Sequence, residues 1–181
     1  MNDKVKDKEF IVGFSRSTKK LRIFSWIIRL YQGMTEYSHV FIKLKVVPRF
    51  PSNKILHAAE GQISHYSETA FLKRNEITDE FTINVCAETY NELKGNMFHE
   101  LAGEPYSILQ NVGIALTKLM RYMGFKNFKN PWTTGWNCSE YVVKILQLIF
   151  VEEFDHLDPN LVTPKELYKI LAQLRTEGRI K

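Results

Sequence analysis

Apolar and polar residues alternate in several short runs in the first half of the chain, which is the pattern of half-buried strands. These runs predict strands at 9–14, 37–47, 54–59 and 80–85. A turn containing Pro48, Pro51 and Ser52 separates the second run from the third, so these two strands are expected to form a hairpin.

Helical spacing replaces the alternation after residue 88, and one earlier segment already shows it. That segment, 21–31, predicts an amphipathic helix ended by Gly33, with an apolar face made of Ile23, Trp26, Ile27 and Leu30. Further helices are predicted near 88–102, 105–123, 138–151 and 164–175, the last with Pro164 at its first position. Strands followed by helices indicate the α+β class, with a small antiparallel sheet packed against several helices.

The chain length suits one globular domain. It has 181 residues, 44% of them hydrophobic, so we expect a single domain over 1–181 with residues 1–8 as a flexible charged tail. The first apolar stretch, 10–14, is too short and too late for a secretory signal. The most apolar window, 141–151, falls short of the roughly 20 residues that span a bilayer. A cytoplasmic protein is predicted, which only lysis, a virion or another secretion route would carry outside.

The net charge favours an anionic neighbour. The formal charge is +5, from 25 Lys and Arg against 20 Asp and Glu, and much of the excess lies between Lys4 and Arg22. Such a field would attract nucleic acid, an anionic lipid surface or an acidic wall polymer. A basic face that only keeps the protein soluble is the simpler interpretation. No specific nucleic-acid motif is present, and the oligomeric state does not follow from the sequence.

The two cysteines, Cys86 and Cys138, form neither a CxxC pair nor a ligand cluster. The sequence thus supports neither a zinc site nor a disulfide framework, and a reducing compartment suits both thiols. We expect no metal and no organic cofactor.

Cys138 is the candidate nucleophile because it stands at the first turn of a predicted helix. Asn137 is placed to be the N-cap, and Glu140 three residues later completes a capping-box pattern. Orphan N–H groups and the positive dipole end at a helix start favour a thiolate, so a lowered pKa is expected for the Cys138 thiol. A buried structural cysteine would have the same sequence context.

Two histidines lie in predicted strands among apolar neighbours. His39 falls in Tyr37–Ile42 and His57 in Ile55–Ala59, so the two side chains can meet across adjacent strands. A cysteine nucleophile needs a base and a group that orients the base, and these two histidines are the candidates. Core histidines bonded to backbone carbonyls are the alternative. The remaining histidines are expected on the surface: His65, His99 and His156.

Several short segments resemble the motifs of the circularly permuted NlpC-type papain-like hydrolases, a group that includes YiiX-like proteins and lecithin retinol acyltransferase-like enzymes. The segments are 37–42, 55–61, 103–106, 137–143 and 161–167. In such families a strand histidine comes first, a second polar residue follows on the next strand, and a helix-opening cysteine comes last. This chain is similar in that order, which implies a papain-like fold.

The same resemblance implies roles for individual residues. Cys138 would be the nucleophile, His39 the general base and His57 the third polar group. Tyr106, in a Gly-x-Pro-Tyr element, would line the catalytic cleft, although a half-buried aromatic at a helix start is the alternative. Glu60 fits the third position less well than His57, which stands directly before Ala58 as the family's residue often does. We retain Glu60, with Asn137, as a support of the cleft.

The chain departs from the family pattern near the cysteine. Ser139-Glu140 stands where many NlpC-type enzymes have Ser-Gly, and Ser107 stands where Asp is frequent in the permuted branch. The loop 124–136 carries Trp132 and leads into Trp136. These rings would form either a stacking wall for a substrate or packing beneath the loop.

These features predict acyl transfer from an amide, ester or thioester through a thioacyl enzyme. An amidase or peptidase acting on a peptide substrate, with cell-wall peptide as the implied example, is the first hypothesis. A lipid acyltransferase or thioesterase is the second, since Trp26 and its apolar neighbours would suit a membrane surface. An inert binding module or virion component with a basic face is the third.

Overall fold

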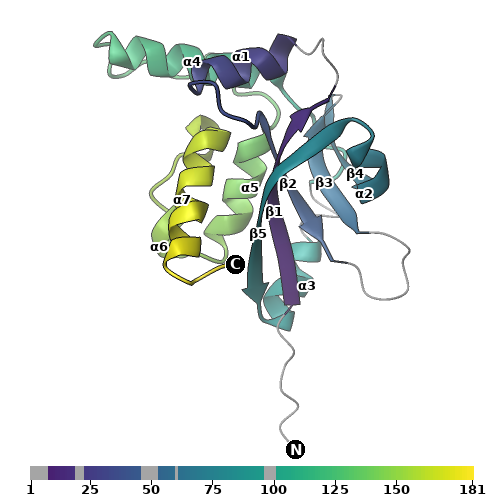
Figure 1. The fold of residues 1–181 in the computed structure, drawn as a ribbon. Coiled ribbons are helices and arrows are strands. Elements are labelled where there is room, and N and C mark those ends of the chain that lie inside the picture. The colour runs from purple at the N-terminus through teal and green to yellow at the C-terminus, as the bar shows by residue number, and fades with distance from the viewer. Residues whose placement is uncertain (1–7, 19–22, 46–52, 60, 96–100) are drawn as a thin grey trace, which may run out of the picture.

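The protein is built on one antiparallel sheet, seen here in a computed structural model that describes residues 8–18, 23–45, 53–59, 61–95 and 101–181. The sheet has five strands in the order β4-β3-β2-β1-β5 (Figure 1). Their bounds are β1 Lys8–Ser17, β2 His39–Leu44, β3 Lys54–Ala59, β4 Gln62–Ser67 and β5 Asn75–Val85. Every neighbouring pair is antiparallel, which confirms the mixed class and the antiparallel sheet.

Seven α-helices accompany the sheet in the described parts of the chain. Their bounds are α1 Ile23–Tyr31, α2 Glu68–Leu72, α3 Ala87–Gly95, α4 Ile108–Tyr122, α5 Cys138–Gln147, α6 Val151–Phe154 and α7 Pro164–Thr176. Within the same residues, none of these helices has the length and apolar character needed to cross a bilayer.

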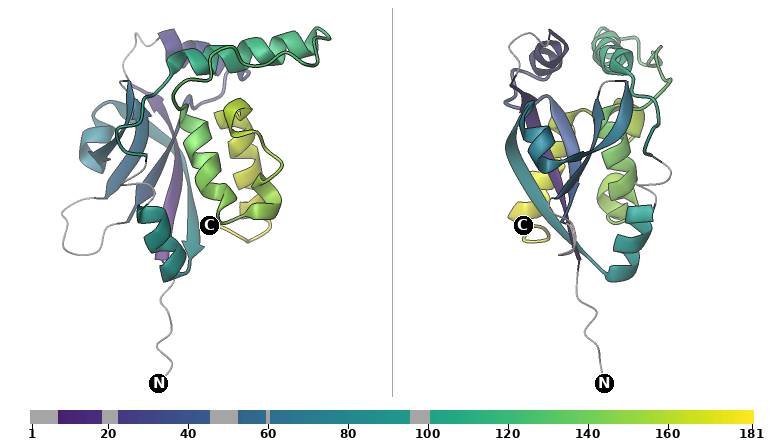
Figure 2. Two further views of the ribbon diagram at one scale, coloured as in Figure 1. Left: turned by 180° about the vertical axis from the view of Figure 1, so that it is seen from behind. Right: turned by 90° about the vertical axis from the view of Figure 1, so that its right-hand side faces the viewer.

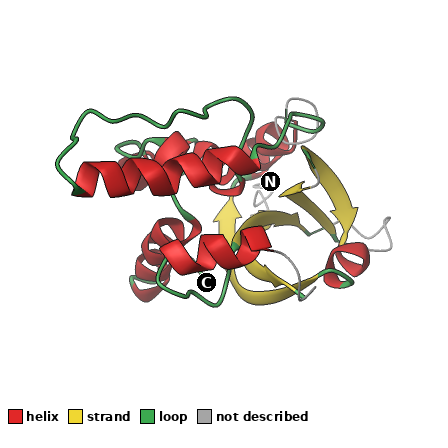
Figure 3. Ribbon diagram, turned by 90° about the horizontal axis from the view of Figure 1, so that it is seen from above, coloured by secondary structure: helices red, strands yellow, loops and turns green. Residues whose placement is uncertain are grey.

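The helices cover distinct parts of the sheet. α5 packs on β2 and stands beside α7 along one face, whereas α2 contacts β3, β4 and β5 (Figure 1). α1 and α4 contact each other and lie together across one end of the molecule, with α3 at the opposite end (Figure 2). Seen from above, the loop that follows α4 returns alongside that helix (Figure 3).

Alternation along the strands divides the buried residues into two clusters. Val12, Phe14, Val40 and Ile42 belong to the main cluster, which also holds α5 and α7 side chains. Phe41 belongs to a second cluster with Ile55 and Phe71. The sheet is therefore buried on both faces around β2, where residues 40 to 44 are all buried.

Three α-helices and strands of the structure were not predicted: β4, α2 and α6, of which α6 is a separate turn of helix where the predicted helix near 138–151 was expected to end. β4 reads Gln-Ile-Ser-His-Tyr-Ser, which is a polar edge strand, and α2 is only 5 residues long with Ser67 as its N-cap. β5 is also longer than the predicted 80–85, because it pairs with β1 along the whole length from Lys8↔Val85 to Ser17↔Asn75.

The tail prediction for residues 1–8 falls mostly outside the described residues. Its last member, Lys8, is instead the first residue of β1 and pairs with Val85.

Candidate active site

The start of α5 is held by both halves of the predicted capping box. The Asn137 side-chain oxygen accepts hydrogen bonds from the backbone N–H groups of Ser139 at 2.8 Å and Glu140 at 2.9 Å. The Glu140 carboxylate accepts from the Asn137 N–H at 3.5 Å in return. These bonds satisfy N–H groups that a helix start leaves unpaired, and they fix the backbone on which Cys138 sits.

A buried contact ties this helix start to α4. Gln110 Nε2 donates to the Glu140 carboxylate at 2.8 Å, and both residues are buried. Lys144 lies 3.4 Å from the same carboxylate, one turn along α5. The Glu140 carboxylate therefore contacts α4, Lys144 of α5 and the N-cap residue. Its contact with α4 was not predicted from the sequence.

The Gly-x-Pro-Tyr element joins the sheet to the segment that precedes Cys138. On one side the Tyr106 N–H donates to the Gly61 carbonyl at 2.9 Å, next to β4. On the other, Trp136 N–H donates to the Pro105 carbonyl at 2.8 Å. Gly135 has φ +84°, and a Cβ there would lie 2.9 Å from the Pro105 oxygen, so only glycine fits this approach. The element thus sets the position from which α5 begins.

Three tyrosines lie within electrostatic range of the Cys138 thiol. A negative charge on Cys138 would raise the pKa of Tyr31, Tyr106 and Tyr141, which places all three near the thiol. Burial is the first cause of the raised pKa at each tyrosine, so all three are neutral at physiological pH. The Tyr106 hydroxyl also accepts from Asn111 Nδ2 at 3.3 Å.

The expectation of a lowered Cys138 pKa is wrong for this structure. The residue has 0% exposure and belongs to the main core cluster. Burial raises the pKa of the thiol, outweighing a backbone N–H at Val40 and the N–H groups at the helix start, which act in the opposite direction. The helix start is present as predicted, but the sulfur is enclosed as a neutral thiol.

The two predicted histidines come together. The rings of His39 and His57 lie 5.4 Å apart, centroid to centroid, in an edge-to-face arrangement. His57 also packs on Tyr66 at 4.6 Å and on Phe71 at 5.1 Å, both in the second cluster. The structure therefore joins the imidazoles of adjacent strands.

His57 lies on the sheet face of the second cluster, because its neighbours Leu56 and Ala58 face the main cluster. The Cys138 sulfur lies in the main cluster, against the backbone of Val40.

Between β2 and β3 the ladder ends early. Strand pairing runs from Leu44↔Lys54 to Ile42↔Leu56, although β2 begins at His39 and β3 continues to Ala59. The Tyr141 hydroxyl lies at this interruption and shares its one proton between the carbonyl oxygens of Leu56 at 3.0 Å and Val40 at 3.3 Å. Tyr141 is thus a positioning residue that sequence reasoning missed; its place in the first turn of α5 was the available signal.

The other predicted residues have separate outcomes. Glu60 and His99 lie outside the described residues, and His156 is exposed as expected. The surface prediction for His65 is wrong, because it lies on β4 half-buried and burial lowers the pKa of its imidazole. Trp136 packs against the main core, with Lys144 Nζ 4.0 Å from its ring centre, which favours packing over a stacking wall.

Neither ligand clusters nor relatives add to this geometry. Within the described residues, no group of three or more His, Cys, Asp or Glu is placed to hold a metal ion. Among known proteins, no family model, curated protein or solved structure matches the chain. Functional inference therefore depends on the site itself.

Proposed function

We propose that the protein is a cysteine-dependent hydrolase of papain-like architecture that cleaves an amide bond through a thioacyl intermediate. One observation carries the proposal: a fully capped helix start holds Cys138 against β2 beside the strand position of His39. The ring of His39 in turn packs on that of His57. Such a reaction requires a nucleophile, a base and a group that orients the base, and in our proposal Cys138, His39 and His57 supply them.

In this mechanism His39 takes the proton of Cys138, and the thiolate attacks the amide carbonyl carbon. The backbone N–H of Cys138 donates to the oxygen that becomes negative, a contact typically worth about 3 kcal/mol in the transition state. The leaving amine takes the proton back from His39, and water then hydrolyses the thioester. His57 orients the His39 ring. Tyr106, near the sulfur, lines the cleft.

The buried sulfur places a requirement on this mechanism. An enclosed neutral thiol is unreactive, so substrate binding has to displace part of the layer that covers it and bring the His39 ring within reach of the sulfur. The same burial favours a second candidate function, a binding module that keeps the fold and does no chemistry.

Acyl trapping separates the two candidates. The C86S variant, whose remaining thiol is Cys138, is incubated with a small acyl thioester and analysed by mass spectrometry. A catalytic site gives an acyl adduct on Cys138 that H39A abolishes, whereas H65A, the matched strand histidine, retains it. An inert module gives no adduct in any variant, provided that thermal melting shows all of them folded.

Substrate class follows from a second assay. Wild-type protein and C138S are incubated separately with muropeptides and with phospholipid vesicles. Cleavage of muropeptides by the wild type and not by C138S supports the amidase proposal. If the wild type deacylates phospholipid and leaves muropeptides intact, the protein is a lipid acyltransferase or thioesterase instead.

A further inference from the structure

Exposed apolar side chains gather on α1, α4 and the turns that follow them. Among the described residues, eleven large hydrophobic or aromatic side chains are markedly exposed, and eight of these lie in that layer. Three are on α1 and its turn: Trp26, Leu30 and Met34. Five are on α4 and its turn, among them Tyr122 with 90% exposure and Phe125 with 57%. We call residues 23–34 and 108–129 the α1–α4 layer.

The sequence segments that form this layer contain Lys and Arg but no Asp or Glu. Residues 10–35 contain five Lys or Arg and no Asp or Glu, but three of the five lie outside the described residues, and Arg16 belongs to β1 and is paired with Glu76, which leaves Arg29 in the described part of the layer. Residues 105–139 contain four Lys or Arg and again no Asp or Glu. The chain as a whole has 20 acidic residues, so the absence of any from residues 23–34 and 108–129, whose helices α1 and α4 contact each other, is a strong local bias.

The cations of this layer keep their charge available. Arg29 Nε donates to the Thr35 carbonyl at 2.6 Å and Arg121 Nε to the Phe128 carbonyl at 3.0 Å, bonds that fix the side chains without cancelling their charge. Lys126 and Lys129 are exposed in the segment after α4. Lys118 is different, because it is paired with Glu166 of α7.

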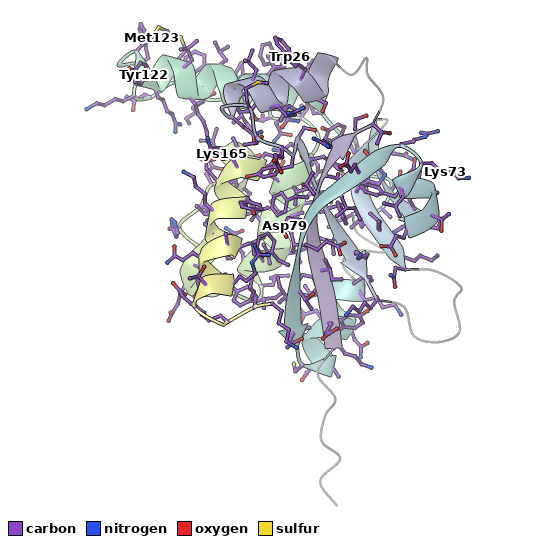
Figure 4. All side chains as sticks on the ribbon, in the orientation of Figure 1. Trp26, Lys73, Asp79, Tyr122, Met123 and Lys165 are labelled. Atoms are coloured by element: carbon purple, nitrogen blue, oxygen red, sulfur yellow. The ribbon has the colours of Figure 1, made fainter. Side chains whose placement is uncertain are left out.

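The exposed aromatic side chains share one end of the molecule. Trp26 on α1 and Tyr122 and Met123 at the far end of α4 all lie at that end, where α4 extends beyond the body (Figure 4). Tyrosine, tryptophan and flanking lysine are the side chains that settle at the boundary between lipid headgroups and acyl chains. Lysine and arginine add attraction to anionic headgroups.

We propose that the α1–α4 layer docks on an anionic lipid surface, with Tyr122, Met123 and Phe125 inserted at the headgroup level and Arg121, Lys126 and Lys129 on lipid phosphates or carboxylates. A nucleic acid would use the cations but not a methionine and an exposed apolar tip, and a second copy of the chain would carry the same positive charge. The docking is independent of catalysis, so C138S binds vesicles as the wild type does.

Vesicle sedimentation tests the proposal. The full chain is mixed with vesicles of phosphatidylcholine alone or with phosphatidylserine added. We expect binding to the mixed vesicles that weakens as salt rises, and at least about tenfold weaker partitioning for K126E/K129E. Y122S/F125S is expected to reduce partitioning to both kinds of vesicle. Matched controls are K73E/K94E and L72S/L148S, which change exposed residues outside the layer and retain wild-type binding.

Three outcomes overturn the proposal. One is the absence of binding to mixed vesicles, and another is equal loss in the layer variants and their matched controls. The third is self-association in light scattering that Y122S/F125S abolishes while vesicle binding stays absent, which would make the layer an interface between copies. Thermal melting of every variant establishes that it is folded.

Discussion

At the residue scale, the two thiols have opposite environments, and that of Cys138 differs from the one that the sequence indicated. Cys86 is exposed directly before α3, where a hydrogen bond with the Thr89 side chain at 3.1 Å is the first cause of its lowered pKa. Cys138 occupies a better-capped helix start, but burial raises its pKa. Solvent access therefore outweighs the helix start in deciding which thiol has the lower pKa.

Alkylation rates should show this order. We expect iodoacetamide to modify Cys86 faster than Cys138 in the folded protein at neutral pH, with the Cys138 rate rising only at higher pH. Mass spectrometry of the alkylated peptides across a pH series measures both rates in one sample. In guanidinium chloride the two rates should converge, and a Cys138 that reacts as fast as Cys86 in the native state would contradict the enclosed thiol.

Gly13 is required by a single neighbour. A Cβ at this position of β1 would collide with the ring of Phe41 on β2. G13A is therefore expected to destabilise the protein by about 1–3 kcal/mol through overpacking. G95A is the control, because nothing lies within 4 Å of that position and its φ is not positive; it should leave stability unchanged or raise it by up to about 1 kcal/mol. Urea denaturation measures both.

At the element scale, helix N-caps could be predicted from the sequence and the edge strand β4 could not. The capping boxes of α5 and α7 follow from Asn137 with Glu140 and from Thr163 with Glu166, since these patterns are local. β4 lacks an apolar alternation that would mark it, because it is an edge strand whose pairing with β3 supplies its order. Local chemistry predicts where a helix begins, whereas partner strands decide where an edge strand lies.

The Tyr141 hydroxyl substitutes for part of the β2–β3 ladder. Removing it in Y141F leaves the buried carbonyl groups of Val40 and Leu56 without this donor, which should cost about 1–3 kcal/mol of unfolding free energy. Y122F, which changes a tyrosine with 90% exposure, should cost nothing measurable. Equal stability of the two variants in guanidinium denaturation would show that the Tyr141 contact is dispensable.

At the scale of the whole molecule, a set of buried neutral acids makes stability depend on alkaline pH. Burial raises the pKa of Cys138, Tyr31, Tyr106 and Tyr141, and raises that of Tyr37 to about 12. A cysteine or tyrosine whose pKa is raised in the folded protein contributes its full stabilisation below the pKa that it has in the unfolded chain, about 8.5 for cysteine and 10 for tyrosine. The folded state loses this stabilisation as pH rises from that pKa toward the folded pKa.

Unfolding free energy should therefore fall above about pH 8.5 and fall more steeply above about pH 10. Denaturation by urea from pH 7 to 11 measures this. C138A removes the first contribution and should flatten the curve between about pH 8.5 and 10, whereas C86A leaves the decline in place. If C138A does not change the decline, the loss of unfolding free energy in this pH range comes from groups other than Cys138.

The topology, and not the chain order, decides which candidate residues meet. His39 and His57 come together because β2 and β3 are neighbours in the sheet, and α5 reaches β2 because the helices after residue 100 pack back over it. The prediction that the two histidines pair is confirmed. Which face each side chain takes depends on strand register, and register follows from pairings that span tens of residues.

The sequence by itself determined the α+β class, most strands and helices and the capped start of α5, because alternation and capping act over short range. Tertiary structure alone decided that the Cys138 sulfur is enclosed, that Tyr141 replaces ladder bonds and that apolar and cationic residues from two distant segments form one exposed layer. Burial and electrostatic environment are sums over neighbours brought together by folding, which no local pattern records.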